Sequence, residues 1–162
     1  MKEILEKISS YNIFNYLLPG TVFGFWATKE YDLTIPTDIL TNAFVYYFLG
    51  MIISRVGSLI IAPILKKVKI TKFENYKDFV KASKKDEKID LLSEVNNMYR
   101  TIIALIVTIG FLKFYNWLES KLIWLTNWNI TIGLVFLLVL FILSYQKQTK
   151  FITKRIKANL DE

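Results

Sequence analysis

Four long apolar runs, separated by charged segments, constrain the fold of this chain more than any other feature of its sequence. The runs span residues 13–27, 39–65, 102–118 and 130–145. A helix needs roughly 20 mostly apolar residues to cross the hydrocarbon core of a bilayer. We therefore predict an all-α, polytopic membrane protein with four transmembrane helices. The alternative, a soluble bundle of very apolar helices, is disfavoured because the charged residues gather between the runs.

The distribution of lysine and arginine predicts the orientation of these helices, because cytoplasmic loops carry an excess of both. Seventeen of them lie in the N-terminus, in segment 66–100 and in the tail 147–157, against three in the opposite connections and their margins. Aromatic residues agree, since Trp and Tyr are enriched at the two membrane interfaces. The tryptophans fall at the predicted outer ends and three tyrosines at the inner ends: Trp26, Trp117, Trp124 and Trp128, and Tyr11, Tyr99 and Tyr145. Both patterns place the two termini in the cytoplasm.

This topology divides the chain into five segments. They are an interfacial amphipathic segment at 1–10, a first transmembrane hairpin at 11–65, a basic cytoplasmic helical segment at 66–98, a second transmembrane hairpin at 99–146 and a basic cytoplasmic tail at 147–162.

A small helical bundle is expected on the cytoplasmic side. Thr71 followed by Glu74 has the spacing of a capping box, which predicts a helix that starts there. The residues at 83–87 predict a turn, and beyond it apolar residues continue at helical spacing into the third run. We therefore expect the membrane helices to project into the cytoplasm and to pack there.

Lysines crowd the cytoplasmic segment in two groups. The proximal lysines, Lys66, Lys67, Lys69 and Lys72, are explained by the positive-inside rule and by attraction to anionic lipid. The distal lysines lie farther from the membrane than a Debye length of about 10 Å. They are the candidate ligand-binding residues, for a nucleotide or an oligonucleotide: Lys81, Lys84, Lys85 and Lys88. Acidic residues alternate with them, so an ordinary solvated face is the alternative interpretation.

Two cationic residues fall within or beside the apolar runs. Arg55 interrupts the second run, and charged groups inside a membrane are costly and often line a pore. The alternative is that Arg55 extends to the inner headgroups and keeps only its stem in the membrane. Lys113, near the outer end of the third run, has the same two interpretations.

The first run contains a second set of pore or gate candidates, Asn15, Pro19 and Gly20. A proline at this position frees a backbone carbonyl and kinks the helix, which suits a gate but also suits simple packing. Small residues follow a helical stripe on the second run, which favours close contact between helices within one subunit or between subunits. The stripe consists of Gly50, Ser54, Gly57 and Ser58.

Catalysis is not supported by the sequence. The chain has no Cys and no His, which excludes thiolate chemistry and the commonest proton shuttle and metal ligand. It also lacks a nucleophile–base pair, metal-ligand spacing and a phosphate-binding loop. We therefore expect no catalytic residue, no metal and no cofactor.

The stretch 9–25 (SSYNIFNYLLPGTVFGF), followed by a second apolar run and a lysine-rich segment, resembles small multi-pass membrane proteins of bacterial anti-phage defence operons. The membrane subunits of the Hailong and Kiwa systems are similar to the whole chain in size and layout. The resemblance implies a homo-oligomer of the bacterial inner membrane, coupled to a soluble operon partner or a nucleic-acid ligand, that disrupts or guards the membrane during infection. It assigns no site residue.

Two functions fit these observations. The first is an oligomeric effector, most simply a tetramer, that acts as a ligand-gated channel or disrupts the membrane when the basic cytoplasmic bundle binds a nucleotide or oligonucleotide. The second is a membrane anchor or sensor that recruits a soluble partner without conducting. A transporter is disfavoured, because the runs contain no acidic residue and no internal repeat.

Overall fold

The computed structural model describes residues 12–32, 34 and 38–160, and over these residues the chain is all-helical. The interfacial segment expected at 1–10 lies outside the described residues. The elements in order are the π-helix η1 (Ile13–Leu17), α3 (Leu18–Tyr31), α4 (Ile39–Val56), the π-helix η2 (Gly57–Ile61), α5 (Ala62–Lys67), α6 (Tyr76–Lys85), α7 (Lys88–Lys121), the 3-10 helix η3 (Ile123–Trp128) and α8 (Asn129–Leu160).

Three of the helices are long and apolar enough to cross a membrane. They are Ile39–Lys67, which joins α4, η2 and α5, then α7, and then Ile123–Leu160, which joins η3 and α8. Most of their apolar surface is exposed, as for Phe111 of α7 and Leu138 of α8. Lipid tails cover such surfaces in a membrane protein. The first apolar run folds as η1 and α3, a shorter helix than these three.

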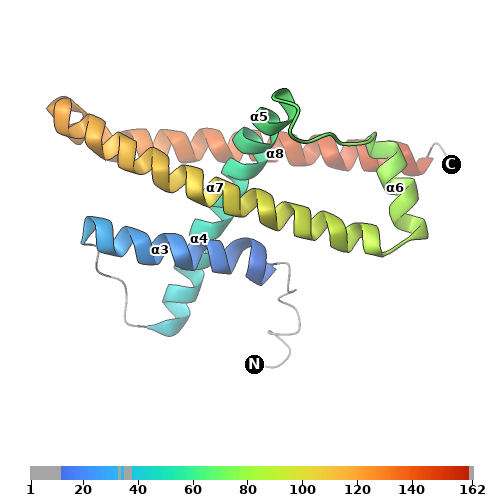
Figure 1. The fold of residues 1–162 in the computed structure, drawn as a ribbon, viewed down its shortest axis with the longest axis horizontal. Helices are drawn as coiled ribbons and strands as arrows, with labels where there is room; N and C mark the ends of the chain where they lie inside the picture. Colours follow the sequence, from blue (N-terminus) through green and yellow to red (C-terminus); the bar gives the residue numbers. More distant parts are fainter. Residues whose placement is uncertain (1–11, 33, 35–37, 161–162) are drawn as a thin grey trace.

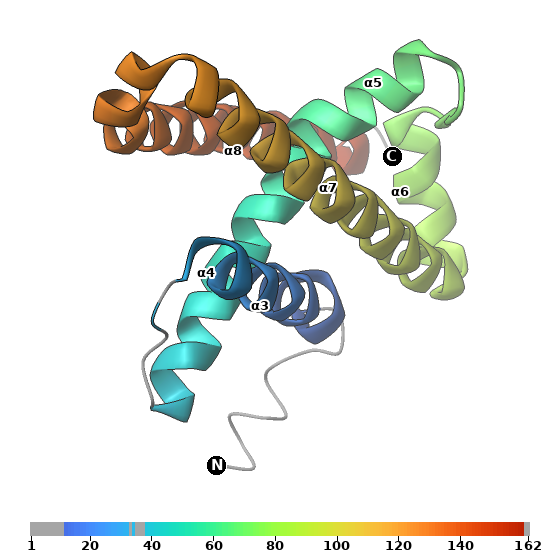
Figure 2. The same cartoon turned by 60° about the vertical axis from the view of Figure 1, so that its left-hand side comes forward.

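The long helices do not form a parallel stack. In both views α4 crosses α3, α7 and α8 steeply, and with η2 it passes between α7 and α8 (Figures 1 and 2). The buried core lies at this passage and is built from Ile53, Val56, Ile61, Ala104, Leu105 and Leu140. Helix α4 is therefore the central element, against which the other long helices pack.

A second, smaller packing unit lies at the opposite end of α7 and α8 from the η3 turn (Figure 1). Here α6 contacts both long helices. The ring of Tyr76 lies 5.6 Å from that of Phe151 on α8, and Val80 is buried. Helix α6 therefore packs against α8 at this end, and the cytoplasmic bundle expected at 66–98 and 147–162 stays a prediction.

The start of α6 differs from the sequence-based prediction. The helix begins at Tyr76 with Asn75 as its N-cap, so the capping box at Thr71 and Glu74 is wrong. Lys69 takes a left-handed conformation (φ 61°), and the Thr71 N–H donates to Leu65 O over 3.4 Å. Because Thr71 is bound to the end of α5 in this way, it does not start a helix. The turn expected within 83–87 is confirmed, since α6 ends at residue 85 and α7 begins at residue 88.

Candidate functional site

Three fully buried polar side chains meet where η1, α4 and α7 come together. Asn15, Ser54 and Thr101 each have an exposed fraction of 0%. Asn15 Nδ2 donates to Ser54 Oγ over 3.2 Å, and the Thr101 hydroxyl donates to Asn15 Oδ1 over 2.7 Å. Burying a polar group without a partner costs free energy, so these bonds favour one relative position of the three helices. We call the three residues the polar crossing.

Two glycines bring α3 and α4 into backbone contact beside the polar crossing. A Cβ added to Gly20 would lie 1.7 Å from the Tyr46 carbonyl oxygen, and one added to Gly50 would lie 1.7 Å from the Tyr16 carbonyl oxygen. The arrangement is reciprocal, because each tyrosine precedes by four residues the glycine on its own helix. Small residues of this kind allow close helix contact in membranes, where Cα hydrogens can approach carbonyl oxygens.

The remaining small residues of the stripe also make contacts within this chain. Ser54 belongs to the polar crossing, and a Cβ added to Gly57 would lie 3.2 Å from Ala104 Cβ on α7. Ser58 binds Lys147 of α8. Each of the four residues of the stripe therefore contacts another helix of the same chain.

Pro19 and Gly20 are both buried, and Gly20 lies in the contact between α3 and α4. The Leu18 N–H donates to Ile13 O, five residues back, which makes η1 a π-helix. In a regular α-helix, the ring of a proline clashes with the carbonyl four residues before it. The wider π turn just before Pro19 changes which carbonyl lies opposite the ring. In this conformation Gly20 faces α4, and Pro19 and Asn15 are buried near it, so none of the three lies on the surface of the chain.

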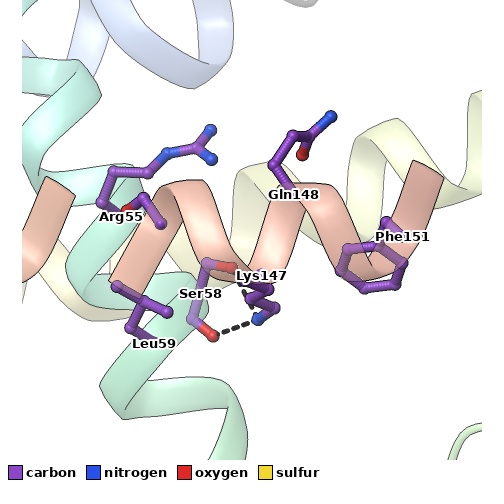
Figure 3. Close-up of a pocket in the computed structure, with 7 residues that line it drawn as sticks. Arg55, Ser58, Leu59, Lys147, Gln148 and Phe151 are labelled. Carbon is purple, nitrogen blue, oxygen red and sulfur yellow. Dashed lines mark hydrogen bonds between the residues drawn. The ribbon is translucent and has the colours of Figure 1, made fainter. Parts of the chain in front are cut away.

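The second π-helix leaves a carbonyl without a backbone donor. In η2 the Ala62 N–H donates to Gly57 O, so the next carbonyl, Ser58 O, would accept from residue 63. Residue 63 is proline, which has no N–H. Instead, Lys147 Nζ donates to Ser58 O over 2.5 Å and to Ser58 Oγ over 2.8 Å (Figure 3). Lys147 thereby connects α8 to η2.

Arg55 makes its contacts inside the chain. Its Nη2 donates to the Tyr16 hydroxyl over 3.2 Å. Its side chain is partly buried and lines a cavity of about 30 Å³ together with Ser58, Lys147 and Gln148 (Figure 3). The two interpretations of Arg55, a pore-lining residue or one that extends to the inner headgroups, stay predictions.

The distal lysines lie apart from Arg55 and the polar crossing, at the corner where α6 turns into α7 (Figure 1). All four of their side chains are exposed. The Lys88 N–H donates to Asp86 Oδ1 over 3.0 Å at the start of α7. From Lys88 to Thr101 the helix rises about 20 Å. The structure therefore gathers Arg55, Asn15, Pro19 and Gly20 at one place and the distal lysines at another.

A further polar group lies near the η3 end of α7. Lys113 Nζ lies 3.8 Å from Glu30 Oε2 at the end of α3. The Tyr115 hydroxyl donates to Asn129 Oδ1, and Asn129 Nδ2 donates to Glu119 Oε1, both over 2.7 Å. Lys113 therefore has a carboxylate neighbour in its own chain, and the turn between α7 and α8 is held by side-chain hydrogen bonds.

Sequence reasoning found Asn15 and Arg55 but missed Thr101, Tyr16 and Lys147 as their neighbours. The predicted depths of Thr101 and Lys147 in the membrane could have indicated these contacts. Thr101 lies two positions after Tyr99 and Lys147 two after Tyr145, both at predicted inner ends. Aligning the four runs at their inner tyrosines and cations would have placed these polar residues in one layer.

The described residues include no group of three or more His, Cys, Asp or Glu side chains that could hold a metal ion. The groups that do come together are amides, hydroxyls and cations. The amides and hydroxyls can fix the relative positions of helices by hydrogen bonds, and the cations can bind an anion.

Over the part of the chain that the structure describes, the protein is all-helical, and three helices are long and apolar enough to cross a membrane, which is consistent with a membrane protein. No family model, no curated protein and no solved structure shows significant similarity to the chain.

Proposed function

We propose that this protein is a four-span effector of the bacterial inner membrane, gated by an anionic ligand that binds the distal lysines. In the proposed topology both termini lie in the cytoplasm, and the first span is formed by η1 and α3. A homo-oligomer, most simply a tetramer, conducts ions or disrupts the membrane when ligand binds. The resemblance to membrane proteins of anti-phage defence operons supports this role.

The relative depth of the helices supports the topology. The positive-inside rule assigns Asn15, Arg55, Thr101 and Lys147 to the inner ends of four different spans. Hydrogen bonds join Asn15 to Thr101 directly, and Lys147 binds Ser58 three residues after Arg55. Glu30 and Lys113, assigned to outer ends, are also neighbours. Contacts at both levels support a common depth for α3 and α7, while α4 meets the other helices near the inner level and crosses them steeply (Figures 1 and 2).

The observation that carries the proposed gating is the continuity of α7. This helix runs without a break from Lys88, at the lysine corner, to Thr101 in the polar crossing and on into its apolar part. A ligand that displaces the corner would therefore also displace Thr101, because a helix transmits motion along its axis as a rigid element.

Oligomerisation is supported by the exposed apolar surface. Phe111, Leu134 and Leu138 each expose about three-fifths of their residue surface. Helix faces of this kind contact lipid or another copy of the chain. In a closed ring, the lysine corners of several subunits would surround one axis and create a stronger field for a polyanion.

The test is binding of a fluorescent single-stranded oligonucleotide to the purified, full-length protein in detergent. Replacing the distal lysines together by glutamine should weaken binding at least about tenfold, with a steep salt dependence in the wild type, because neutralised phosphates release counterions. Replacing Lys66, Lys67 and Lys69 is the matched control, which should mainly weaken membrane placement. Equal binding by the distal variant and the wild type would contradict the proposed ligand site.

The second candidate is a non-conducting anchor or sensor that recruits a soluble partner. It is favoured by one observation: Asn15, Pro19 and Gly20 are buried within the chain and do not line its surface. Dye uptake by cells that express the protein separates the two functions. Permeability that changes with Arg55→Ala supports the channel, whereas oligonucleotide binding without any permeability change supports the anchor.

A further inference from the structure

We propose that the cavity between α4, η2 and α8 binds a phosphate group, held by Arg55, Ser58 and Lys147. The phosphate belongs either to an anionic lipid of the inner leaflet or to a small soluble phosphate compound. This site is separate from the distal lysines, and only its lipid form rests on the proposed membrane topology.

The first argument is the accumulation of positive charge. Arg55 of α4 and Lys147 of α8 line the cavity from different helices (Figure 3). Arg55 and also Arg100 of α7 lie close enough to act electrostatically on the Lys147 ammonium. No carboxylate is among the described residues that line the cavity. Like charges that share a partly buried place repel each other, and a bound anion removes this repulsion.

The second argument is that the fold holds these donors in place before any ligand arrives. Pro63 and the π register of η2 leave Ser58 O open, and Lys147 Nζ binds it and Ser58 Oγ. The ammonium has three N–H donors, and Ser58 accepts two. The Phe151 ring lies with its centroid 6.0 Å from the same Nζ. The position of the ammonium is therefore fixed by backbone geometry, and one donor is left for a ligand.

The third argument concerns Arg55. A guanidinium has five N–H donors, and the Tyr16 hydroxyl accepts one of them. Within the described part of the chain its buried Nε has no hydrogen-bond partner. Arginine suits a phosphate oxygen, because its planar guanidinium is always charged and presents several N–H donors in a fixed geometry.

The size of the cavity limits the ligand. A cavity of about 30 Å³ admits only water-sized groups, since one water needs at least about 10–15 Å³ of such volume. A phosphate group can place one oxygen there and leave its remaining atoms, and whatever is attached to them, outside. Basic pockets between helices at the cytoplasmic side of a membrane bind lipid headgroups in this way.

The test uses the full-length protein in nanodiscs of phosphatidylcholine, with and without phosphatidylglycerol, and in detergent with inorganic phosphate. The readout is the thermal unfolding midpoint as each probe is titrated. In the wild type, one of the two probes should raise the midpoint in a saturable manner. Arg55→Gln and Lys147→Gln should each weaken that response about tenfold or more, the loss expected for one charge-assisted hydrogen bond.

Lys150→Gln is the matched control, because it removes the same charge from an exposed position one turn along α8. It should leave the response within about twofold of the wild type. Lys147→Gln also leaves the Ser58 carbonyl without its donor. If that variant fails to fold, Arg55→Gln still tests the site. A response to phosphatidylglycerol alone identifies a lipid phosphate, and a response to inorganic phosphate identifies a soluble one.

Absence of a response to both probes would overturn the proposal. So would an equal loss in Arg55→Gln, Lys147→Gln and Lys150→Gln, which indicates a diffuse basic surface. The distal lysines are unchanged in every variant, so neither result bears on the oligonucleotide site.

Discussion

At the scale of single residues, the molecule depends on positions with no room for a side chain. Gly20 and Gly50 press against the carbonyl oxygens of Tyr46 and Tyr16, while Gly110 and Gly133 have nothing within 4 Å of an added Cβ. The six glycines of this chain thus do not have one common role.

We expect Gly50→Ala to lower the stability of the protein by about 1–3 kcal/mol, because the added methyl group separates α3 from α4. Gly110→Ala is the matched control. It should be neutral or stabilise by up to about 1 kcal/mol, since alanine favours helix and meets no neighbour there. Thermal unfolding in detergent measures both, and equal midpoints for the two variants would contradict the close contact.

The polar crossing allows a similar comparison between two threonines of α7. Thr101→Val removes the donor to Asn15 Oδ1 and should destabilise by about 1 kcal/mol. Thr108→Val should have little effect, because the Thr108 hydroxyl has no hydrogen-bond partner in the described part of the chain. The thermal unfolding midpoints of the two variants measure the difference. A larger loss of stability for Thr108→Val than for Thr101→Val would contradict the role of the polar crossing.

At the scale of elements, the sequence predicted the helices better than their contacts. Hydrophobic runs and the turn at 83–87 predicted α7 as one helix from the lysine corner into its apolar part. They did not predict that α4 passes between α7 and α8, since the four runs have similar apolar faces that fit many packings. They also gave a wrong start for α6, because the hydrogen bond from Thr71 to Leu65 is not visible in local spacing.

The N-terminus of α4 makes a prediction about pH. The Thr41 hydroxyl and backbone N–H both donate to Asp38 Oδ2 over 2.7 Å. These bonds hold the pKa of the Asp38 carboxyl below its usual value. A lowered pKa means that the cap stabilises the helix above the pKa of the unfolded chain, and that this contribution is lost as the pH falls through the folded pKa.

We therefore expect Asp38→Ala to unfold at a lower temperature than the wild type at neutral pH, with a difference that shrinks in strong acid. Circular dichroism melts at the two pH values measure this difference. A difference of the same size at both would show that the carboxylate is not the capping group.

The continuity of α7 can be tested by breaking the helix between the lysine corner and the polar crossing. Asn96→Pro, at an exposed position, removes one helical hydrogen bond and kinks the helix. It should leave oligonucleotide binding within about threefold but abolish the ligand-dependent permeability change. Asn96→Ala is the control and should retain both; a permeability response in Asn96→Pro equal to the wild type would contradict coupling through α7.

At the scale of the whole molecule, three helices within residues 12–32, 34 and 38–160 are long and apolar enough to cross a membrane, and the fourth span, formed by η1 and α3, is part of our proposal. The polar crossing joins this shorter helix to α4 and α7. Whether this helix crosses the membrane determines on which side the N-terminus lies. The sequence contains no cysteine, which makes single introduced cysteines specific reporters.

Labelling of four single-cysteine variants by a membrane-impermeant maleimide therefore tests the topology most directly. Lys2→Cys, Lys84→Cys and Leu160→Cys should react only after the cells are opened, while Thr34→Cys should react on intact cells or spheroplasts. Labelling of residue 2 from outside would reduce the protein to three spans. Labelling of residue 84 from outside would place the distal lysines on the wrong side of the membrane and contradict the proposed function.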